Sequence, residues 1–287
     1  MGKTPVVAWL GTGLMGASMA GRLLQQGHTV RVWNRTPEKA APLAERGATV
    51  TATPEEAARQ ADLVITMLSD HPATRTVLEG LALHGKTVIQ MATIAPEESR
   101  QLALLVQGRG GRYLEAPVLG SIPEAKAGTL IIMIGGDPSL FQRWRPLLQQ
   151  LGREIHRIGE MGRAAALKLA LNQLIAALTV AFATSLRYVE HHQVEVDQFM
   201  AVLHRSALYA PTFDKKLPRM LSHEYGNPNF PTEHLIKDID LFLKSAAGID
   251  PQALTAIGRL YCKALTGHRF EDYSCVFEAV REDDKST

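Results

Sequence analysis

Cysteine is almost absent from this chain: its 287 residues include only Cys262 and Cys275, and neither has a C-x-x-C or other metal-ligand spacing. Two isolated cysteines cannot build the disulfide framework of a small secreted domain, so a reducing compartment is expected. The ten histidines lack ligand spacing as well. His191 and His192 are neighbours, and neighbouring residues on a helix do not face the same way. We therefore expect no metal site.

An excess of one charge is also missing. The formal net charge is +2 and the two signs alternate along the chain, which argues against a nucleic-acid partner. The start lacks the long apolar core and cleavage site of a signal peptide. The run ALKLALNQLIAALTVAFA approaches the length of a membrane span, but it contains Lys168, Asn172 and Gln173. A buried helix is favoured, so we expect a cytoplasmic protein with no membrane partner.

Short β-rich runs alternate with helical segments in the first half of the chain. The runs are VVAWLG, TVRVWN, DLVITML and KTVIQM, followed later by RYLEAPV and TLIIMIGG. This alternation is typical of βαβ units, in which a parallel sheet is covered by helices on both faces. The first half is therefore predicted to be an α/β domain.

The rhythm changes after about Gly162, where long helical segments follow one another at 162–192, 195–207, 233–247 and 251–266. Turn sequences such as YAPTF, EYGNPNFP and GIDP separate them. We predict two domains, residues 1–161 and 162–287, the second all-helical, with the long helix at 162–192 joining them.

A glycine-rich loop follows the first β-run and opens an Ala/Leu-rich segment. Gly11, Gly13 and Gly16 have the spacing G-x-G-x-x-G. In this context Gly11 permits a tight turn, Gly13 lets the backbone approach a pyrophosphate, and Gly16 lets the helix pack closely on the strand. A Rossmann-type dinucleotide site is predicted, with loop residues Gly11, Thr12, Gly13, Leu14, Met15 and Gly16.

The end of the second β-run selects the cofactor. An acidic residue there would bind the ribose 2′-hydroxyl of NAD, but this chain has Asn34, Arg35 and Thr36. A carboxylate would repel a 2′-phosphate, whereas a guanidinium can hold one with two hydrogen bonds. We predict NADP(H) rather than NAD(H); the alternative is that Arg35 is only a surface charge.

Lys168 and Asn172 interrupt the apolar run and are four residues apart, so a helix places both on one face. Burying an ammonium group is costly unless it is paired or its pKa is lowered, which makes such a lysine a credible proton donor. Carbonyl reduction needs a hydride from a nicotinamide and a proton for the developing alkoxide. Lysines on such helices more often extend to solvent, so the spacing alone leaves both interpretations open.

Several motifs, in order, make the chain resemble the β-hydroxyacid dehydrogenase family, which includes the 3-hydroxyisobutyrate dehydrogenases. They are GTGLMGASMAGRLLQQGH, MATIAPEES, EAPVLGSIPEAKAGTL, GEMGRAAALKLALN and HLIKDIDLFL. The resemblance covers nearly the whole chain. The segments APTFDKKLPRML, FPTEHLIKDIDL and EDYSCVFEAV are most similar to the branch of glyoxylate and succinic semialdehyde reductases.

The resemblance implies a role for particular residues of this chain. Lys168 would be the catalytic acid and Asn172 would place the substrate. Thr93 would lie near the cofactor ribose and nicotinamide, Lys237 would contact the cofactor from the helical domain, and Met67 and Leu68 would pack against the nicotinamide or its ribose. The loop Leu119, Gly120 and Ser121 would hold the substrate carboxylate through backbone N–H groups and a hydroxyl.

Four positions depart from the family pattern. Leu119 and Ala92 stand where serine is usual, and Arg163 and Ala164 stand where asparagine and glycine are usual. The expected activity is NADPH-dependent reduction of a small aldehyde or keto acid, with glyoxylate and succinic semialdehyde as leading substrates.

The alternatives are an imine reductase or another hydroxyacid dehydrogenase on the same fold, and an NADP-binding interaction module without turnover. The resemblance and the Ala-rich helix also favour a homodimer or homotetramer. Asp238 and Asp240 are interpreted as structural, with Asp238 pairing with a basic residue.

Overall fold

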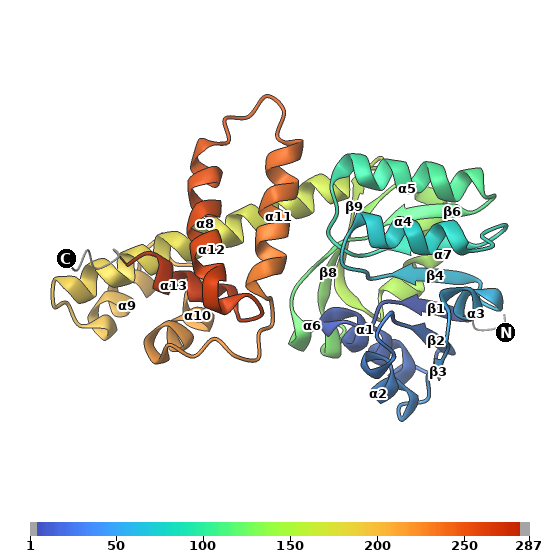
Figure 1. Ribbon diagram of the computed structural model, residues 1–287, viewed down its shortest axis with the longest axis horizontal. Helices are drawn as coiled ribbons and strands as arrows, with labels where there is room; N and C mark the ends of the chain where they lie inside the picture. The colour runs from blue at the N-terminus through green and yellow to red at the C-terminus, as the bar shows by residue number, and fades with distance from the viewer. Residues whose placement is uncertain (1–4, 282–287) are drawn as a thin grey trace. The chain divides into compact units, whose positions relative to one another are not determined.

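The computed structural model describes residues 5–281 (Figure 1). The chain divides into two compact units, residues 1–168 and residues 169–287. Helix α8 (Arg163–His191) contains residues of both. The first unit is α/β and the second is helical.

One sheet of nine strands organises the described part of the first unit. The strands are β1 (Val7–Leu10), β2 (Val30–Trp33), β3 (Thr49–Val50), β4 (Leu63–Thr66), β5 (Thr87–Gln90), β6 (Arg112–Glu115), β7 (Val118–Leu119), β8 (Leu130–Gly135) and β9 (Gly152–Gly159). Their order is β3-β2-β1-β4-β5-β6-β8-β7, and β9 pairs with β8. Pairing is antiparallel where β8 meets β6 and β7, and parallel in the other pairs.

Helices cover both faces of this sheet. They are α1 (Leu14–Gln25), the 3-10 helix η1 (Pro37–Lys39), α2 (Ala41–Ala44), α3 (Pro54–Arg59), α4 (His71–Gly80), α5 (Pro96–Gly108), α6 (Ile122–Ala127) and α7 (Pro138–Leu148). Alternation along the strands sends Trp9 and Ile65 into a core with α1, α6 and α7, and Ala8 and Val64 into a second core with α3, α4 and α5. The predicted α/β class and the two-sided covering of the sheet are confirmed.

Strands β3 and β9 were not predicted from the sequence. Both residues of β3 are exposed. In β9 only the first and last residues are buried, and the residues between them are exposed or half-buried. Such strands carry too few apolar residues for periodicity to reveal them. Strand β9 ends at Gly159, shortly before the predicted boundary between residues 161 and 162.

Up to residue 281, the second unit consists of α-helices and one short 3-10 helix. After α8 come α9 (Val196–His204), α10 (Pro211–Ser222), α11 (Thr232–Ser245), α12 (Gln252–His268), the 3-10 helix η2 (Tyr273–Cys275) and α13 (Val276–Ala279). The segment YAPTF was interpreted as a turn, and this was wrong in part, because α10 begins at Pro211. Proline is favoured in the first turn of a helix as well as in turns, so its presence did not decide between them.

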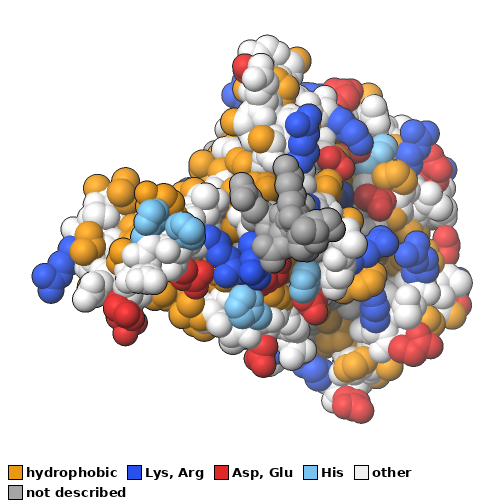
Figure 2. Space-filling view, turned by 60° about the vertical axis from the view of Figure 1, so that its left-hand side comes forward, with side chains coloured by type: hydrophobic (Ala, Val, Ile, Leu, Met, Phe, Trp, Pro, Cys, Tyr) orange, Lys and Arg blue, Asp and Glu red, His pale blue; other side chains and the backbone are white. Residues whose placement is uncertain are grey.

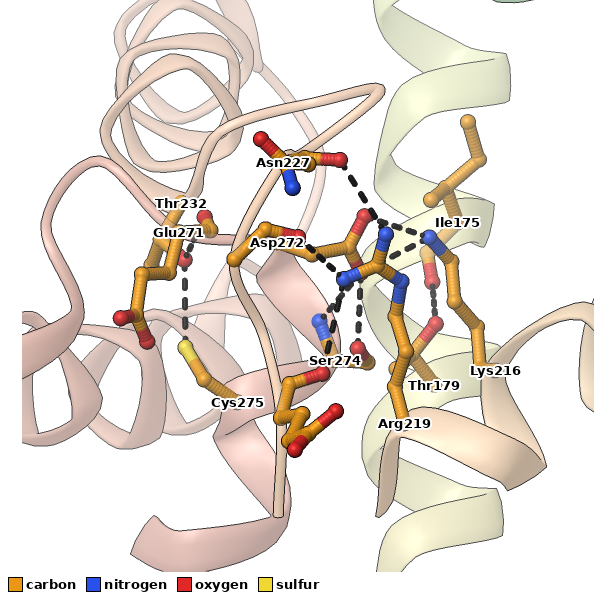
Figure 3. Close-up of polar contacts among 12 residues, drawn as sticks. Ile175, Thr179, Lys216, Arg219, Asn227, Thr232, Glu271, Asp272, Ser274 and Cys275 are labelled. Atoms are coloured by element: carbon orange, nitrogen blue, oxygen red, sulfur yellow. Dashed lines mark hydrogen bonds and ion pairs between the residues drawn. The ribbon is translucent and has the colours of Figure 1, made fainter. Parts of the chain in front are cut away.

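A buried ion pair ties α10 to η2 in this unit (Figure 3). Lys216 Nζ lies 2.8 Å from both carboxylate oxygens of Asp272 and 4.1 Å from the centre of the Tyr273 ring. Asp272 also accepts hydrogen bonds from the backbone N–H and the hydroxyl of Ser274. Burial lowers the pKa of Lys216, and the neighbouring Asp272 carboxylate opposes that shift.

Helix α8 is long and apolar enough, by length and composition alone, to cross a membrane. Its most apolar window has a mean hydropathy of 1.7, and 44% of that window is buried inside the structure. Core helices pass the same test, so this evidence for a span is weak. On the face shown in Figure 2, Lys and Arg side chains are interspersed with Asp and Glu.

Candidate active site

The glycine loop joins β1 to α1, and packing requires two of its glycines. Gly11 has a φ of +104°, and a Cβ there would lie 2.3 Å from the carbonyl oxygen of Met67. A Cβ on Gly16 would lie 2.1 Å from the carbonyl oxygen of Gly11. A Cβ on Gly13 would meet nothing within 4 Å. The backbone at Gly13 is therefore open to a ligand, as close approach of a pyrophosphate requires.

Asn34 connects this loop to the end of β2. Its Oδ1 accepts a hydrogen bond from the Thr12 N–H at 2.9 Å, and its Nδ2 donates to the Thr36 carbonyl at 2.9 Å. The side chain therefore shapes the loop with neutral groups, at the position where an acidic residue would bind a ribose. The neighbouring Arg35 is exposed.

The sheet topology gathers further predicted cofactor residues at the same edge. Strands β2, β1, β4 and β5 are parallel neighbours, so the loops at their carboxyl ends lie side by side. Met67 and Leu68 follow β4, and Thr93 follows β5; all three are half-buried. The strand order reverses between β1 and β4: the sheet extends from β1 to β2 and β3 on one side, and from β4 to β5 and β6 on the other. Open α/β sheets bind their ligands at such switch points.

Lys168 and Asn172 are both buried on α8, with exposed fractions of 8% and 2%. Asn172 Nδ2 donates a hydrogen bond of 2.6 Å to Asp238 Oδ2 on α11. With its amide nitrogen held in this way, Asn172 presents Oδ1 as an acceptor, and among the described residues that oxygen has no hydrogen bond. A buried acceptor in this state is complementary to a donor such as an ammonium or a substrate hydroxyl.

Asp238 is the residue that sequence reasoning undervalued. Besides Asn172, its carboxylate meets Lys237, whose Nζ lies 3.0 Å from Asp238 Oδ1. The expected pairing with a basic residue is present, and the same carboxylate also positions Asn172. A signal was available, because Asp238 lies on the same helical face as the buried Leu235, where an acidic residue needs partners.

The predicted substrate loop lies between β7 and α6. Gly120 has a φ of +130°, a conformation that favours glycine. Ser121 caps α6, and both its N–H and its hydroxyl donate to Glu124 Oε2, at 2.8 and 2.6 Å. A substrate carboxylate that used these two donors would have to replace the Glu124 carboxylate. Leu119, at the end of β7, is half-buried.

A second buried carboxylate, Glu115, was not singled out from the sequence. Its Oε2 accepts a hydrogen bond from Ser99 Oγ at 2.5 Å, and the Ser99 hydroxyl also lies 3.2 Å from the Tyr113 hydroxyl. Burial raises the pKa of Glu115, and the hydrogen bonds from Ser99 and from backbone N–H groups act against that shift. Burial also raises the pKa of Tyr113.

Comparison with known proteins identifies the family of the chain. Residues 6–162 match the NAD-binding domain of 6-phosphogluconate dehydrogenase, and residues 162–271 match the NAD-binding domain of NADP-dependent 3-hydroxyisobutyrate dehydrogenase. The chain belongs to the β-hydroxyacid dehydrogenase family. The resemblance inferred from the motifs is confirmed, and the protein is an NAD(P)-dependent oxidoreductase of the hydroxyacid dehydrogenase type.

Individual members of the family are similar over nearly the whole of this chain. Glyoxylate/succinic semialdehyde reductase 1 of Arabidopsis thaliana is 34% identical over 284 residues, which cover 96% of this chain and 98% of that protein. The chloroplastic reductase 2 of the same plant is 31% identical over 97% of this chain and 80% of its own length. Mycobacterium tuberculosis 3-hydroxyisobutyrate dehydrogenase, solved with L-serine, has a TM-score of 0.89, 27% identity, and coverage of 97% of this chain and 100% of its own.

Proposed function

We propose that this β-hydroxyacid dehydrogenase uses NADPH to reduce a small aldehyde or 2-oxo acid to the hydroxy acid, with glyoxylate and succinic semialdehyde as the leading substrates. The observation that carries the proposal is the buried Lys168–Asn172 face of α8, with Asn172 fixed by Asp238. The names of the two plant reductases support the choice of substrates.

The proposed chemistry divides between a bound cofactor and the chain's own residues. NADPH supplies the hydride when it is bound. Lys168 donates a proton to the carbonyl oxygen as negative charge develops on it. Asn172 Oδ1 accepts a hydrogen bond from the lysine ammonium or from the hydroxyl that forms. Leu119, Gly120 and Ser121 hold the carboxylate, and this requires the Glu124 side chain to turn away from Ser121.

The cofactor contacts are assigned along the edge of the sheet described above. The glycine loop holds the pyrophosphate, Asn34, Arg35 and Thr36 surround the ribose of the adenosine, and Met67, Leu68 and Thr93 contact the nicotinamide side, with Lys237 as a further contact. The same proposal assigns cofactor binding to a domain of residues 1–161, and substrate binding and oligomer contacts to a domain of residues 162–287. It also includes assembly as a homodimer or homotetramer and location in the cytoplasm.

Arg35→Ala tests the choice of NADPH. Loss of a charge-assisted contact with the 2′-phosphate is expected to raise the KM for NADPH about 10-fold or more, while the KM for NADH changes little. Initial rates with both cofactors measure this. The control is Lys39→Ala, which removes another exposed charge from the segment between β2 and α2. Equal changes for both cofactors in Arg35→Ala would mean that Arg35 does not read the phosphate.

A substrate panel tests the reaction itself. NADPH oxidation is measured with glyoxylate, succinic semialdehyde, other small aldehydes and keto acids, and cyclic imines. The proposal expects the highest kcat/KM for a carboxylate-bearing aldehyde or 2-oxo acid. Activity confined to imines would identify an imine reductase, and NADPH binding without oxidation of any compound would identify a binding module.

A further inference from the structure

Helix α8, which carries Lys168, begins without an acidic residue in its own first turn. The first N–H groups of a helix have no partner within the helix and must be satisfied from elsewhere. Here the partner comes from the end of β6. Glu115 Oε1 accepts from the N–H groups of Gly162 at 2.9 Å, Ala164 at 2.8 Å and Ala165 at 3.4 Å.

The surroundings of Glu115 are built to receive this carboxylate. The side chain is 1% exposed, and its second oxygen is fixed by Ser99 of α5. Gly135, its partner on β8, leaves the necessary space, because a Cβ there would lie 2.1 Å from Glu115 Oε1. Gly162 has a φ of +92° and gives the turn before α8 its shape. One carboxylate thus joins β6 and α5 to the start of α8.

We propose that Glu115 is a positioning residue for the reaction, acting through Lys168 by fixing the start of α8. The inference rests on the proposed role of Lys168 as proton donor. Lys168 lies four residues after Ala164, one helical turn or about 6 Å along the axis. A negative charge at a helix N-terminus is favourable, so the carboxylate both satisfies the N–H groups and complements the helix dipole. Proton transfer requires the donor to be held close to its productive geometry.

Two substitutions at Glu115 distinguish the effect of its hydrogen-bond acceptor from the effect of its negative charge. Glu115→Ala removes the acceptor from all three N–H groups. Glu115→Gln keeps the volume and an oxygen acceptor but removes the charge. Asp137→Ala is a matched control, because Asp137 Oδ1 caps α7 through the N–H groups of Ser139 and Leu140 at 2.7 and 2.9 Å without touching α8. Circular dichroism selects a temperature at which every variant is folded.

Glu115→Ala is expected to lower kcat about 100-fold, the loss typical of a small displacement of a reacting group, with the Kd for NADPH unchanged. Glu115→Gln is expected to lose less, and Asp137→Ala to keep the wild-type kcat. Hydrogen exchange of peptides spanning 160–170 should be accelerated in Glu115→Ala and unchanged in Asp137→Ala.

The decisive measurement is Glu115→Ala in a Lys168→Ala background. If Glu115 acts through Lys168, the double variant has the same residual rate as Lys168→Ala. An equal loss in both backgrounds would overturn the proposal, and so would wild-type kcat in Glu115→Ala. Wild-type turnover in Lys168→Ala alone would instead refute the proposed function, while the exchange data would still report whether Glu115 orders α8.

Discussion

Replacing Lys168 with alanine is expected to lower kcat about 1,000-fold, the range associated with losing a positioned general acid, while NADPH still binds. The ammonium is the only part of the side chain that can deliver a proton to the carbonyl oxygen, and alanine preserves the helix. Stopped-flow measurement of a single turnover would place the loss in the chemical step.

Three comparisons make this result specific to Lys168. Lys244→Ala removes an exposed lysine from α11 and should leave kcat unchanged. Lys168→Arg keeps the positive charge but should remain slow, because a guanidinium does not release its proton at neutral pH. Near-normal turnover in Lys168→Ala that binds NADPH would contradict the mechanism.

The cofactor half of the site could be predicted because its signals are local. Close backbone approaches require Gly11 and Gly16, whereas the space around Gly13 is open, so the spacing of the three glycines is tied directly to the geometry of the loop. The βαβ pattern then determined which strand ends would be neighbours. Arg35 is different. Its side chain is exposed, as expected both for a residue that contacts the cofactor and for an ordinary surface charge. For that reason a kinetic comparison is needed there.

The contacts that were missed join residues far apart in the sequence. Asn172 and Asp238 are 66 positions apart, and Glu115 and Gly162 are 47 apart. Helical periodicity placed Lys168 and Asn172 on one face, but no periodic signal can say which carboxylate meets that face. Both Glu115 and Asp238 were nevertheless marked by chemistry, since each is an acidic residue within an otherwise buried strand end or helix face. Burial of a carboxylate implies partners even before they can be named.

The hydrogen-bond donors of Ser121 differ from expectation in their partner. The resemblance assigned its hydroxyl to the substrate, yet the structure gives that hydroxyl and the backbone N–H to Glu124. A capping box is a local signal, S-x-x-E, that is readable in the sequence at Ser121 and Glu124. The same donors therefore serve helix stability and the proposed recognition of a carboxylate. With Leu119 in place of the usual serine, a substrate acid bound as proposed would compete with Glu124 for fewer hydroxyl donors.

The second large effect concerns stability rather than chemistry. Lys216→Ala is expected to destabilise the protein by about 3–5 kcal/mol, because it leaves the Asp272 carboxylate buried without its cation. Asp272 is 0% exposed and Lys216 is 8% exposed, so water cannot replace the lost partner. The midpoint of thermal unfolding should fall by about 10 °C. Calorimetry or circular dichroism measures the shift.

An exposed pair of the same length provides the control for this prediction. Arg75 Nε and Glu79 Oε1 are also 2.8 Å apart, but their side chains are 57% and 44% exposed, so Arg75→Ala should cost less than about 1 kcal/mol. Replacing both buried partners, as in Lys216→Met with Asp272→Asn, should recover part of the lost stability. No unpaired charge then remains, and the introduced amide oxygen can still accept from Ser274.

Below the unfolding transition, kcat should be unchanged in each of these variants. If Lys216→Ala costs no more than Arg75→Ala, the ion pair does not stabilise the helical unit in the way its burial implies.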